Sequence, residues 1–175
     1  ARNLSEDTMS GENVTGMRSS ITLLGAMLGR CREVTMAYPG GCVIGQRPID
    51  MHLSALRKMG VTIIEKEGCF TARVKSLEGT VINLPISSVG ATENVILAAV
   101  MARGVTVLQN AAKEPEIATL CEFLREAGAV IEGIGGSVLI IQGGHELHGV
   151  SFRIPADRIV AGTYLMSVIG AGGNV

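Results

Sequence analysis

The chain has 175 residues, of which 47% are hydrophobic and 3% aromatic, and its formal net charge is −1. This length and composition suit one domain, or one and a half, with a core of Val, Ile, Leu, Met and Ala. A near-neutral chain without Trp lacks the basic face and the stacking aromatics of most nucleic-acid binders. We therefore expect neither nucleic acid nor a membrane surface as a partner.

The four cysteines contain no C-x-x-C pair, and the chain shows neither a signal-peptide pattern nor an apolar run long enough to cross a bilayer. Free thiols in a reducing cytoplasm are the simplest interpretation, so we expect a cytoplasmic protein. Residues 1–14 are polar and do not begin with Met. We interpret them as a surface lead-in or a cut end.

Periodicity and turn residues predict alternating helices and strands in the first half of the chain. In chain order these are a helix at 17–28, a strand at 33–37, a helix at 48–60, strands at 61–66 and 69–74 joined by a Glu67-Gly68 turn, and a strand at 80–85. The second helix is amphipathic, with Leu53, Leu56 and Met59 on its apolar stripe.

The second half predicts the same order of elements again. They are an apolar helix at 92–103, a strand at 104–111, an amphipathic helix at 115–128, a hairpin at 129–143, a strand at 149–155 and a third apolar helix at 156–173. The closest internal match, "LRKMGVTIIE" against "LREAGAVIE", has a period of about 68 residues, which suits a unit of two helices and four strands. We expect the apolar helices to lie between sheets and the amphipathic ones to cover them.

The two units differ in the connection between the first strand and the amphipathic helix. The span from Val34 to Gly60 uses 27 residues, and the equivalent span from Val105 to Gly128 uses 24. The three extra residues fall where "PGGCVIG" places Cys42 among glycines. Loops carried on a repeated scaffold often hold the functional residues, so this loop is a candidate site.

Cys42 is an idle loop thiol, a metal ligand or a reactive group. Arg47, close by in sequence, would favour the thiolate, but the residues alone leave an inert thiol and a functional one equally open. The glycines of "GGCVIGQR" lack the Lys-Ser/Thr of a phosphate-binding P-loop. The stretch "GGHELHG" lacks the H-E-x-x-H pattern and a third zinc ligand, so neither stretch predicts a site.

Three further positions either bind a ligand or only build the fold. Pro48 suits the first turn of a helix, which would put Asp50 near the positive end of the helix dipole and leave Arg47 to hold a phosphate or carboxylate. Ser87 and Ser88 either cap the buried helix or, with its free N–H groups, bind an anion. Arg18 begins the first apolar helix, where an arginine usually has a partner.

Taken together, these stretches resemble the UDP-N-acetylglucosamine 1-carboxyvinyltransferase family of enolpyruvyl transferases. The matching segments are "GMRSSITLLG", "PGGCVIGQRPIDMH", "SVGATENVILAA", "NAAKEPEI" and "IPADRIVAGTY", in the family's order. The resemblance implies an α/β fold, an inside-out α/β barrel with two lobes of three repeated units and the active site between the lobes. Residues 1–155 would be two units of the catalytic lobe, and residues 156–175 would begin the second lobe, so the chain would be under half of such an enzyme.

The resemblance also implies a reaction. The enolpyruvyl group of phosphoenolpyruvate passes to the 3′-hydroxyl of UDP-N-acetylglucosamine and phosphate leaves, with no redox cofactor and no catalytic metal. This is the first committed step of peptidoglycan synthesis, and so serves cell-wall biogenesis, cell shape and cell division. Cys42 matches the loop cysteine that acts as general acid, can form a covalent adduct with phosphoenolpyruvate and is alkylated by fosfomycin. Arg18 and Arg47 match arginines that bind phosphoenolpyruvate or other anionic groups.

The remaining matches concern the nucleotide sugar. The segments that match its site contain Arg47, Pro48, Ile49, Asp50, Met51, Ser87, Ser88 and Val89. Some family members have a basic residue where this chain has Ile86. The family's general-base aspartate, an N-terminal lysine and a later arginine lie outside this chain, so we expect weak binding and no turnover from the chain alone. The alternatives are the sister enzyme that makes 5-enolpyruvylshikimate 3-phosphate, which lacks the "PGGC" loop, and a non-catalytic paralogue or binding module.

Overall fold

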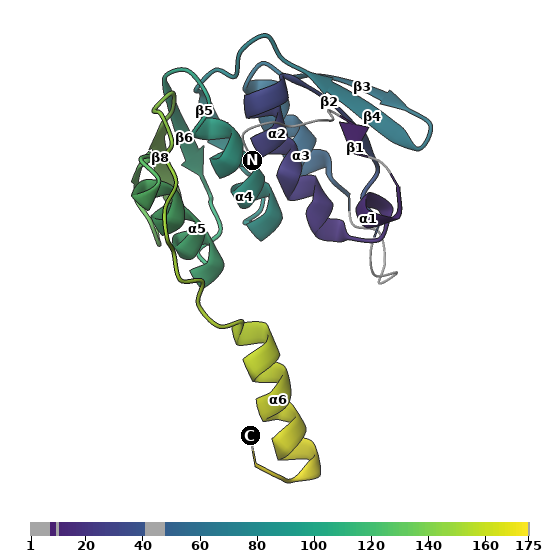
Figure 1. The fold of residues 1–175 in the computed structure, drawn as a ribbon, viewed down its shortest axis with the longest axis vertical. Coiled ribbons are helices and arrows are strands. Elements are labelled where there is room, and N and C mark those ends of the chain that lie inside the picture. The colour runs from purple at the N-terminus through teal and green to yellow at the C-terminus, as the bar shows by residue number, and fades with distance from the viewer. Residues whose placement is uncertain (1–7, 10, 41–47, 175) are drawn as a thin grey trace.

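Two four-stranded sheets with helices between them make up the body of the molecule (Figure 1). The computed structural model describes residues 8, 9, 11–40 and 48–174. The first sheet has the order β1-β2-β4-β3 and the second β5-β6-β8-β7. The strands are β1 (Thr8–Met9), β2 (Glu33–Ala37), β3 (Thr62–Lys66), β4 (Cys69–Arg73), β5 (Val81–Asn83), β6 (Val105–Gln109), β7 (Val130–Glu132) and β8 (Val138–Gln142).

The two sheets share one topology, which confirms that the chain repeats, but the strand predicted to close the first unit, β5, pairs with β6 and so belongs to the second sheet. In each sheet the first two strands of the order are parallel and the other neighbours are antiparallel. β1 therefore takes in the first sheet the place that β5 takes in the second. The interpretation of residues 1–14 as a mere lead-in is wrong at Thr8 and Met9, because their backbone pairs with Thr35 and Met36 of β2.

The predicted helices are present in the predicted order, but the first is divided into a 3-10 helix and an α-helix, and a short helix at Glu12–Thr15 was not predicted. The helices are α1 (Glu12–Thr15), the 3-10 helix η1 (Arg18–Thr22), α2 (Leu23–Cys31), α3 (Asp50–Lys58), α4 (Val89–Ala99), α5 (Pro115–Glu126) and α6 (Arg158–Ala171). α4 begins three residues before its predicted start, because Ser88 serves as its N-cap. α3 begins at Asp50, so Pro48 precedes the Ile49 N-cap and does not lie in the first turn as predicted.

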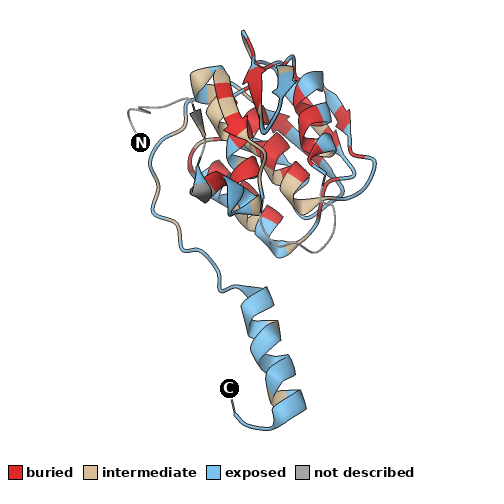
Figure 2. Ribbon diagram, turned by 90° about the vertical axis from the view of Figure 1, so that its right-hand side faces the viewer, coloured by how far each residue is buried: buried red, intermediate tan, exposed pale blue. Residues whose placement is uncertain are grey.

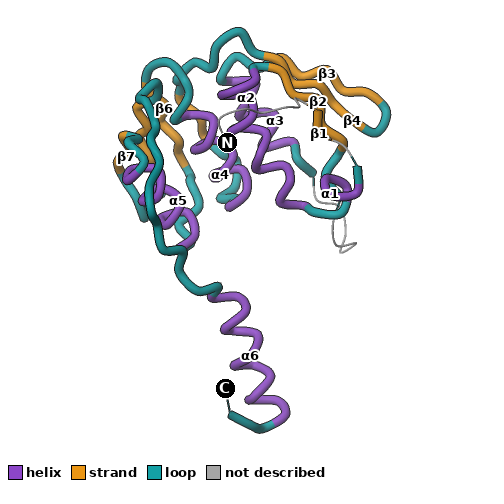
Figure 3. Tube along the Cα trace, in the orientation of Figure 1, coloured by secondary structure: helices purple, strands orange, loops and turns teal. Residues whose placement is uncertain are grey.

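Two of the three predicted apolar helices, α2 and α4, lie between the two sheets, as the sequence predicts (Figure 3). α2 contacts both β2 and α4, and α4 contacts β6 and β8. The amphipathic helices pack beside them, since α3 contacts α4 and β3 while α5 contacts α4 and β7. The apolar stripes of the amphipathic helices are buried at Leu53, Leu56, Met59, Ile117 and Leu124. The core that results is continuous across both units.

The two predicted hairpin turns are also present. Gly68 joins β3 to β4 with a φ of 75°, and Gly135 lies in the β7–β8 turn with a φ of 81°. Such positive φ values cost little only at glycine, because the residue has no Cβ. The connection between β2 and α3 runs from residue 38 to 49, whereas the equivalent connection between β6 and α5 runs from 110 to 114. The longer connection contains Cys42, as the sequence comparison predicts.

The C-terminal part departs from the prediction. Residues 149–155 form no strand. A strand needs a neighbour for its backbone hydrogen bonds, and none of the described strands pairs with this segment. α6 projects away from the sheets and buries none of its residues, although it is almost entirely apolar (Figure 2). Within the described residues, no helix combines the length and the apolar character that a membrane span requires.

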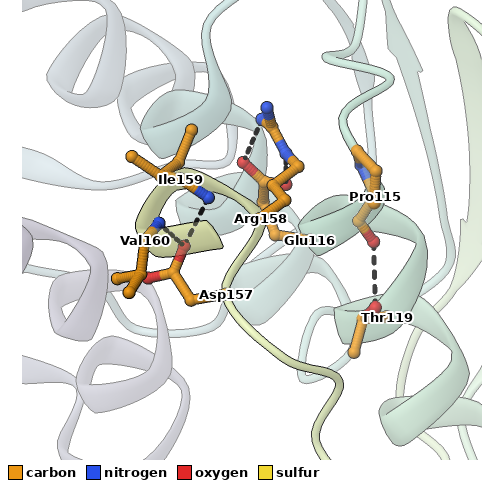
Figure 4. A network of polar contacts seen from close by, with 7 residues as sticks. All are labelled: Pro115, Glu116, Thr119, Asp157, Arg158, Ile159 and Val160. Atoms are coloured by element: carbon orange, nitrogen blue, oxygen red, sulfur yellow. Dashed lines mark hydrogen bonds and ion pairs between the residues drawn. The ribbon is translucent and has the colours of Figure 1, made fainter. Parts of the chain in front are cut away.

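Polar contacts fix the first turn of α6 against α5 (Figure 4). The Arg158 guanidinium donates to both carboxylate oxygens of Glu116, at 3.1 and 2.9 Å. This hydrogen bonding holds the pKa of Glu116 below its usual range. The Asp157 carboxylate caps α6 by accepting from the amides of Ile159 and Val160, at 2.8 and 3.2 Å.

Candidate functional site

Arg18 joins the first apolar helix to the start of α3. It begins η1 and is half-buried, and its Nη2 donates to the carbonyl oxygen of Pro48 at 2.9 Å. Pro48 is exposed and Ile49 is buried with 6% of its surface accessible. Asp50 is the exposed first residue of α3, at the positive end of the helix dipole, and Met51 beside it is half-buried. Arg18 therefore has a hydrogen-bond partner, as expected, and this partner is a backbone carbonyl in the segment predicted to bind the nucleotide sugar.

The second predicted group, Ser87 to Val89, forms the start of α4. Ser88 is half-buried and its Oγ accepts from the amide of Ala91 at 3.4 Å, so the capping interpretation holds for this serine. Ser87 is exposed and Val89, the first residue of the helix, is half-buried. A Cβ added to Gly90 would lie 3.3 Å from Cε1 of His52, which places the start of α4 directly against α3.

A buried asparagine holds these elements together. Asn94 of α4 has no accessible surface, and its Oδ1 accepts from the Gly25 amide at 2.6 Å. Its Nδ2 donates to the Ile21 carbonyl at 3.1 Å and lies 3.1 Å from Nδ1 of His52. One side chain therefore links η1, α2, α3 and α4. A Cβ at Gly25 would lie 2.6 Å from Asn94 Oδ1, so the close approach of α2 to α4 requires glycine there.

His52 is neutral in this arrangement. The backbone groups of Gly25 and Ile21 fix the orientation of the Asn94 amide, so its Nδ2 faces His52 as a donor. Nδ1 of His52 must then accept, which places the ring proton on Nε2. Burial, with a smaller contribution from the charge of Arg18, lowers the pKa of His52 to about 4. A protonated ring would turn a second N–H toward Asn94 and break the network.

Two hollows lie beside the segment that leads into α4. The first, of about 240 Å³, is lined by Asp50 and Met51 together with the backbone neighbours Ile82 to Pro85. The second, of about 490 Å³, is lined by Ser87, Asn110, Ala111, Lys113, Glu114 and Ser137. Asp50 and Met51 at the start of α3 thus line the first hollow, and Ser87, which precedes the N-cap of α4, lines the second. Helix N-termini and an arginine suit anionic and hydrogen-bonding groups.

Cys42 and Arg47 lie outside the described residues. Of the other cysteines, Cys121 is buried, whereas Cys31 and Cys69 are half-buried, and all three are free. The part of the chain that the structure describes contains no group of three or more His, Cys, Asp or Glu side chains placed to hold a metal ion.

His52 and Asn94 were not predicted from the sequence. His52 lies in the amphipathic α3 and Asn94 in the apolar α4, and the hydrogen-bond partners of Asn94 lie 42 to 73 positions away in the sequence. The available signal was Asn94 itself, because an amide in a nearly all-apolar helix needs buried partners.

The arrangement of repeated units is shared with solved structures of enolpyruvyl transferases. The enolpyruvyl transferase NikO from Streptomyces tendae matches with a TM-score of 0.68 and 21% identity, over 79% of this chain and 33% of that one. EPSP synthase from Acinetobacter baumannii matches with a TM-score of 0.65 and 25% identity, over 85% and 34%. The fold is therefore that of the enolpyruvyl transferases, and the α/β fold predicted from the sequence is confirmed.

The family follows from the sequence comparison. The family model described as EPSP synthase (3-phosphoshikimate 1-carboxyvinyltransferase) matches residues 2–175. The chain belongs to this family.

Within the family, the resemblance to UDP-N-acetylglucosamine 1-carboxyvinyltransferases is confirmed. The chain is 45% identical over its full length to UDP-N-acetylglucosamine 1-carboxyvinyltransferase 2 of Caldanaerobacter subterraneus subsp. tengcongensis, and covers 42% of that protein. It is 49% identical over 93% of its length to UDP-N-acetylglucosamine 1-carboxyvinyltransferase of Zymomonas mobilis subsp. mobilis, and covers 38% of it. The chain thus spans about two fifths of the length of these relatives.

Proposed function

We propose that the protein that carries this chain transfers the enolpyruvyl group of phosphoenolpyruvate to the 3′-hydroxyl of UDP-N-acetylglucosamine and releases phosphate. The observation that carries this proposal is the identity of 45–49% to relatives named for that activity, over 93–100% of this chain. The neighbouring starts of α3 and α4 support it, because they offer N–H groups to an anionic, hydroxyl-rich ligand. The site then binds small molecules, and neither nucleic acid nor a membrane.

Each predicted residue has a part in this proposal. The nucleotide sugar lies along Pro48 to Met51 and Ser87 to Val89, and Arg18 and Arg47 hold the anionic groups of phosphoenolpyruvate. Cys42 is the general acid that protonates the methylene carbon. Protonation of the methylene carbon makes the neighbouring carbon electrophilic. Because the site excludes water, this carbon reacts with the sugar hydroxyl and is not hydrolysed.

The reaction proceeds by addition and then elimination. Cys42 gives its proton to C3 of phosphoenolpyruvate, and the 3′-hydroxyl oxygen then bonds to C2 while its own proton passes to a base. C3 next loses a proton and the bond between C2 and the phosphate oxygen breaks. The double bond returns, phosphate leaves and the enolpyruvyl ether remains. No oxidant or reductant takes part.

The proposal extends to the organisation and setting of the protein. Residues 1–155 are two units of a catalytic lobe. Residues 156–175, which contain α6, begin a second lobe, and the apolar α6 packs against the rest of that lobe. The reaction is the entry to peptidoglycan synthesis in the cytoplasm, and so supports cell-wall biogenesis and division.

The test uses the complete protein that contains this chain. Phosphate release and the enolpyruvyl product are followed with phosphoenolpyruvate and either UDP-N-acetylglucosamine or shikimate 3-phosphate as acceptor. Product from the first acceptor is expected, and product from shikimate 3-phosphate alone would favour the sister enzyme. Fosfomycin should add one mass equivalent at Cys42 when UDP-N-acetylglucosamine is present, and should add none to a Cys42→Ala variant. A protein that binds the sugar nucleotide but forms no product would be a non-catalytic paralogue.

A further inference from the structure

His52 lies between the two helix starts that carry the predicted nucleotide-sugar segments. It belongs to the first turn of α3, two residues after Asp50, and only 6% of its surface is accessible. α3 packs against α4, and a Cβ added to Gly90 in the first turn of α4 would lie 3.3 Å from Cε1 of His52 and 3.6 Å from its Nε2. The edge of the imidazole ring therefore sets how closely the two helix starts approach.

The contacts of His52 belong to a closed circuit through η1, α3 and α4. Its Nδ1 lies 3.1 Å from Nδ2 of Asn94 in α4, and the same Nδ2 donates to the carbonyl of Ile21 in η1, at 3.1 Å. η1 begins at Arg18, whose guanidinium donates to the carbonyl of Pro48, just before α3, at 2.9 Å. Each of the three elements is thus joined to both others. A shift of any one of them strains the hydrogen bonds that join it to the other two.

The link from α4 to α3 requires a hydrogen-bond acceptor near the Cβ of residue 52. The Gly25 amide and the Ile21 carbonyl fix the orientation of the Asn94 amide, so its second N–H faces His52. A neutral imidazole accepts this N–H at Nδ1, whereas an apolar side chain of similar size would leave it buried and unpaired. An asparagine at this position would offer its Oδ1 close to the place of Nδ1, but it would lack the ring edge that meets Gly90.

We propose that His52 is a positioning residue for the nucleotide sugar, and that its Nδ1 and its ring edge hold the starts of α3 and α4 at the spacing that the ligand requires. The inference rests on the proposed function, since it takes its ligand from there. Residues 48–51 and 87–89 then keep one arrangement in the free protein, so binding loses little free energy to ordering them. His52 acts through these two segments and takes no part in the chemical step.

The first experiment measures the dissociation constant of UDP-N-acetylglucosamine by titration calorimetry, and kcat by product formation, with the complete protein. His52→Leu keeps the bulk of the side chain but removes the acceptor, and it should raise the dissociation constant about tenfold. His52→Asn keeps the acceptor and should bind within about threefold of the parent. In both variants kcat at saturating substrate should change less than the dissociation constant, because the bound ligand restores the arrangement.

Gly90→Ala tests the ring edge by itself. The added methyl group would meet Cε1 of His52 at 3.3 Å, so the two helix starts must move slightly apart. Alanine also favours a helix over glycine, so the unfolding midpoint should not fall. The dissociation constant should nevertheless rise about threefold. This rise should disappear when Gly90→Ala is combined with His52→Asn, because asparagine has no atom at the place of Cε1.

A control separates positioning from general stability. Ile131→Val trims a buried side chain of the edge strand β7, and it should lower the unfolding midpoint without changing the dissociation constant. A dissociation constant of His52→Leu within about twofold of the parent, or an equal loss in His52→Asn, would overturn the positioning role. If His52→Leu does not fold, Gly90→Ala decides, and a loss that persists in the double variant would overturn the role. A parent protein that does not bind UDP-N-acetylglucosamine would overturn the proposed function as well.

Discussion

Replacing Asn94 by Ala should lower the free energy of unfolding more than the replacement of any other single polar residue at the junction of η1, α2, α3 and α4. The substitution leaves the Gly25 amide, the Ile21 carbonyl and Nδ1 of His52 without their partner. Each buried polar group that loses its hydrogen bond costs about 1–3 kcal/mol, so the sum for the three groups is roughly 3–9 kcal/mol if the site does not relax. That is a large part of the 5–15 kcal/mol by which domains are usually stable.

Urea unfolding, followed by far-UV circular dichroism, measures this loss. The control is Asn83→Ala, which removes an exposed asparagine from β5 and should change the free energy of unfolding by no more than about 0.5 kcal/mol. Amide hydrogen exchange at Gly25 should accelerate in Asn94→Ala, because its acceptor is gone. A loss of less than about 1 kcal/mol with unchanged exchange at Gly25 would refute the claim that Asn94 holds the junction.

Three further predictions concern titration, reactivity and capping. The pKa of His52 is about 4 in the folded protein and 6.5 in the unfolded chain. The free energy of unfolding should therefore be highest above pH 6.5 and fall by roughly 3 kcal/mol as the pH drops toward 4. This fall should be absent in His52→Gln. Burial raises the pKa of Cys121 to about 11, so iodoacetamide at pH 8 should label it only after unfolding, and native labelling would contradict its burial. Asp157→Ala should cost α6 about 1 kcal/mol by removing its N-cap, seen as faster amide exchange at Ile159 and Val160; unchanged exchange would exclude a capping role.

Repetition made much of the fold predictable. The apolar stripe of Leu53, Leu56 and Met59 and the hairpin turns at Gly68 and Gly135 are local patterns, and the structure contains each of them. β1 escaped prediction because two residues carry no periodicity. The second unit indicates where β1 should lie, because β5 precedes α4 in the chain as β1 precedes η1 and α2.

The failures at the C-terminal end and at the site have a common cause. A strand at 149–155 and a buried α6 both require partners that the described residues do not supply, and no local pattern states whether a partner exists. His52 and Asn94 meet only through the packing of α3 on α4. Tertiary contacts of this kind are fixed by the whole fold, so a sequence pattern can mark a polar residue as unusual without naming its partner.

We propose above all that the starts of α3 and α4 form one site for the nucleotide sugar. Hydrogen exchange of the complete protein, with and without UDP-N-acetylglucosamine, tests it most directly. We expect slower exchange in peptides covering residues 48–53 and 86–91, and unchanged exchange in the β3–β4 hairpin at 62–73. Binding that protects the hairpin and leaves both helix starts unchanged would contradict it.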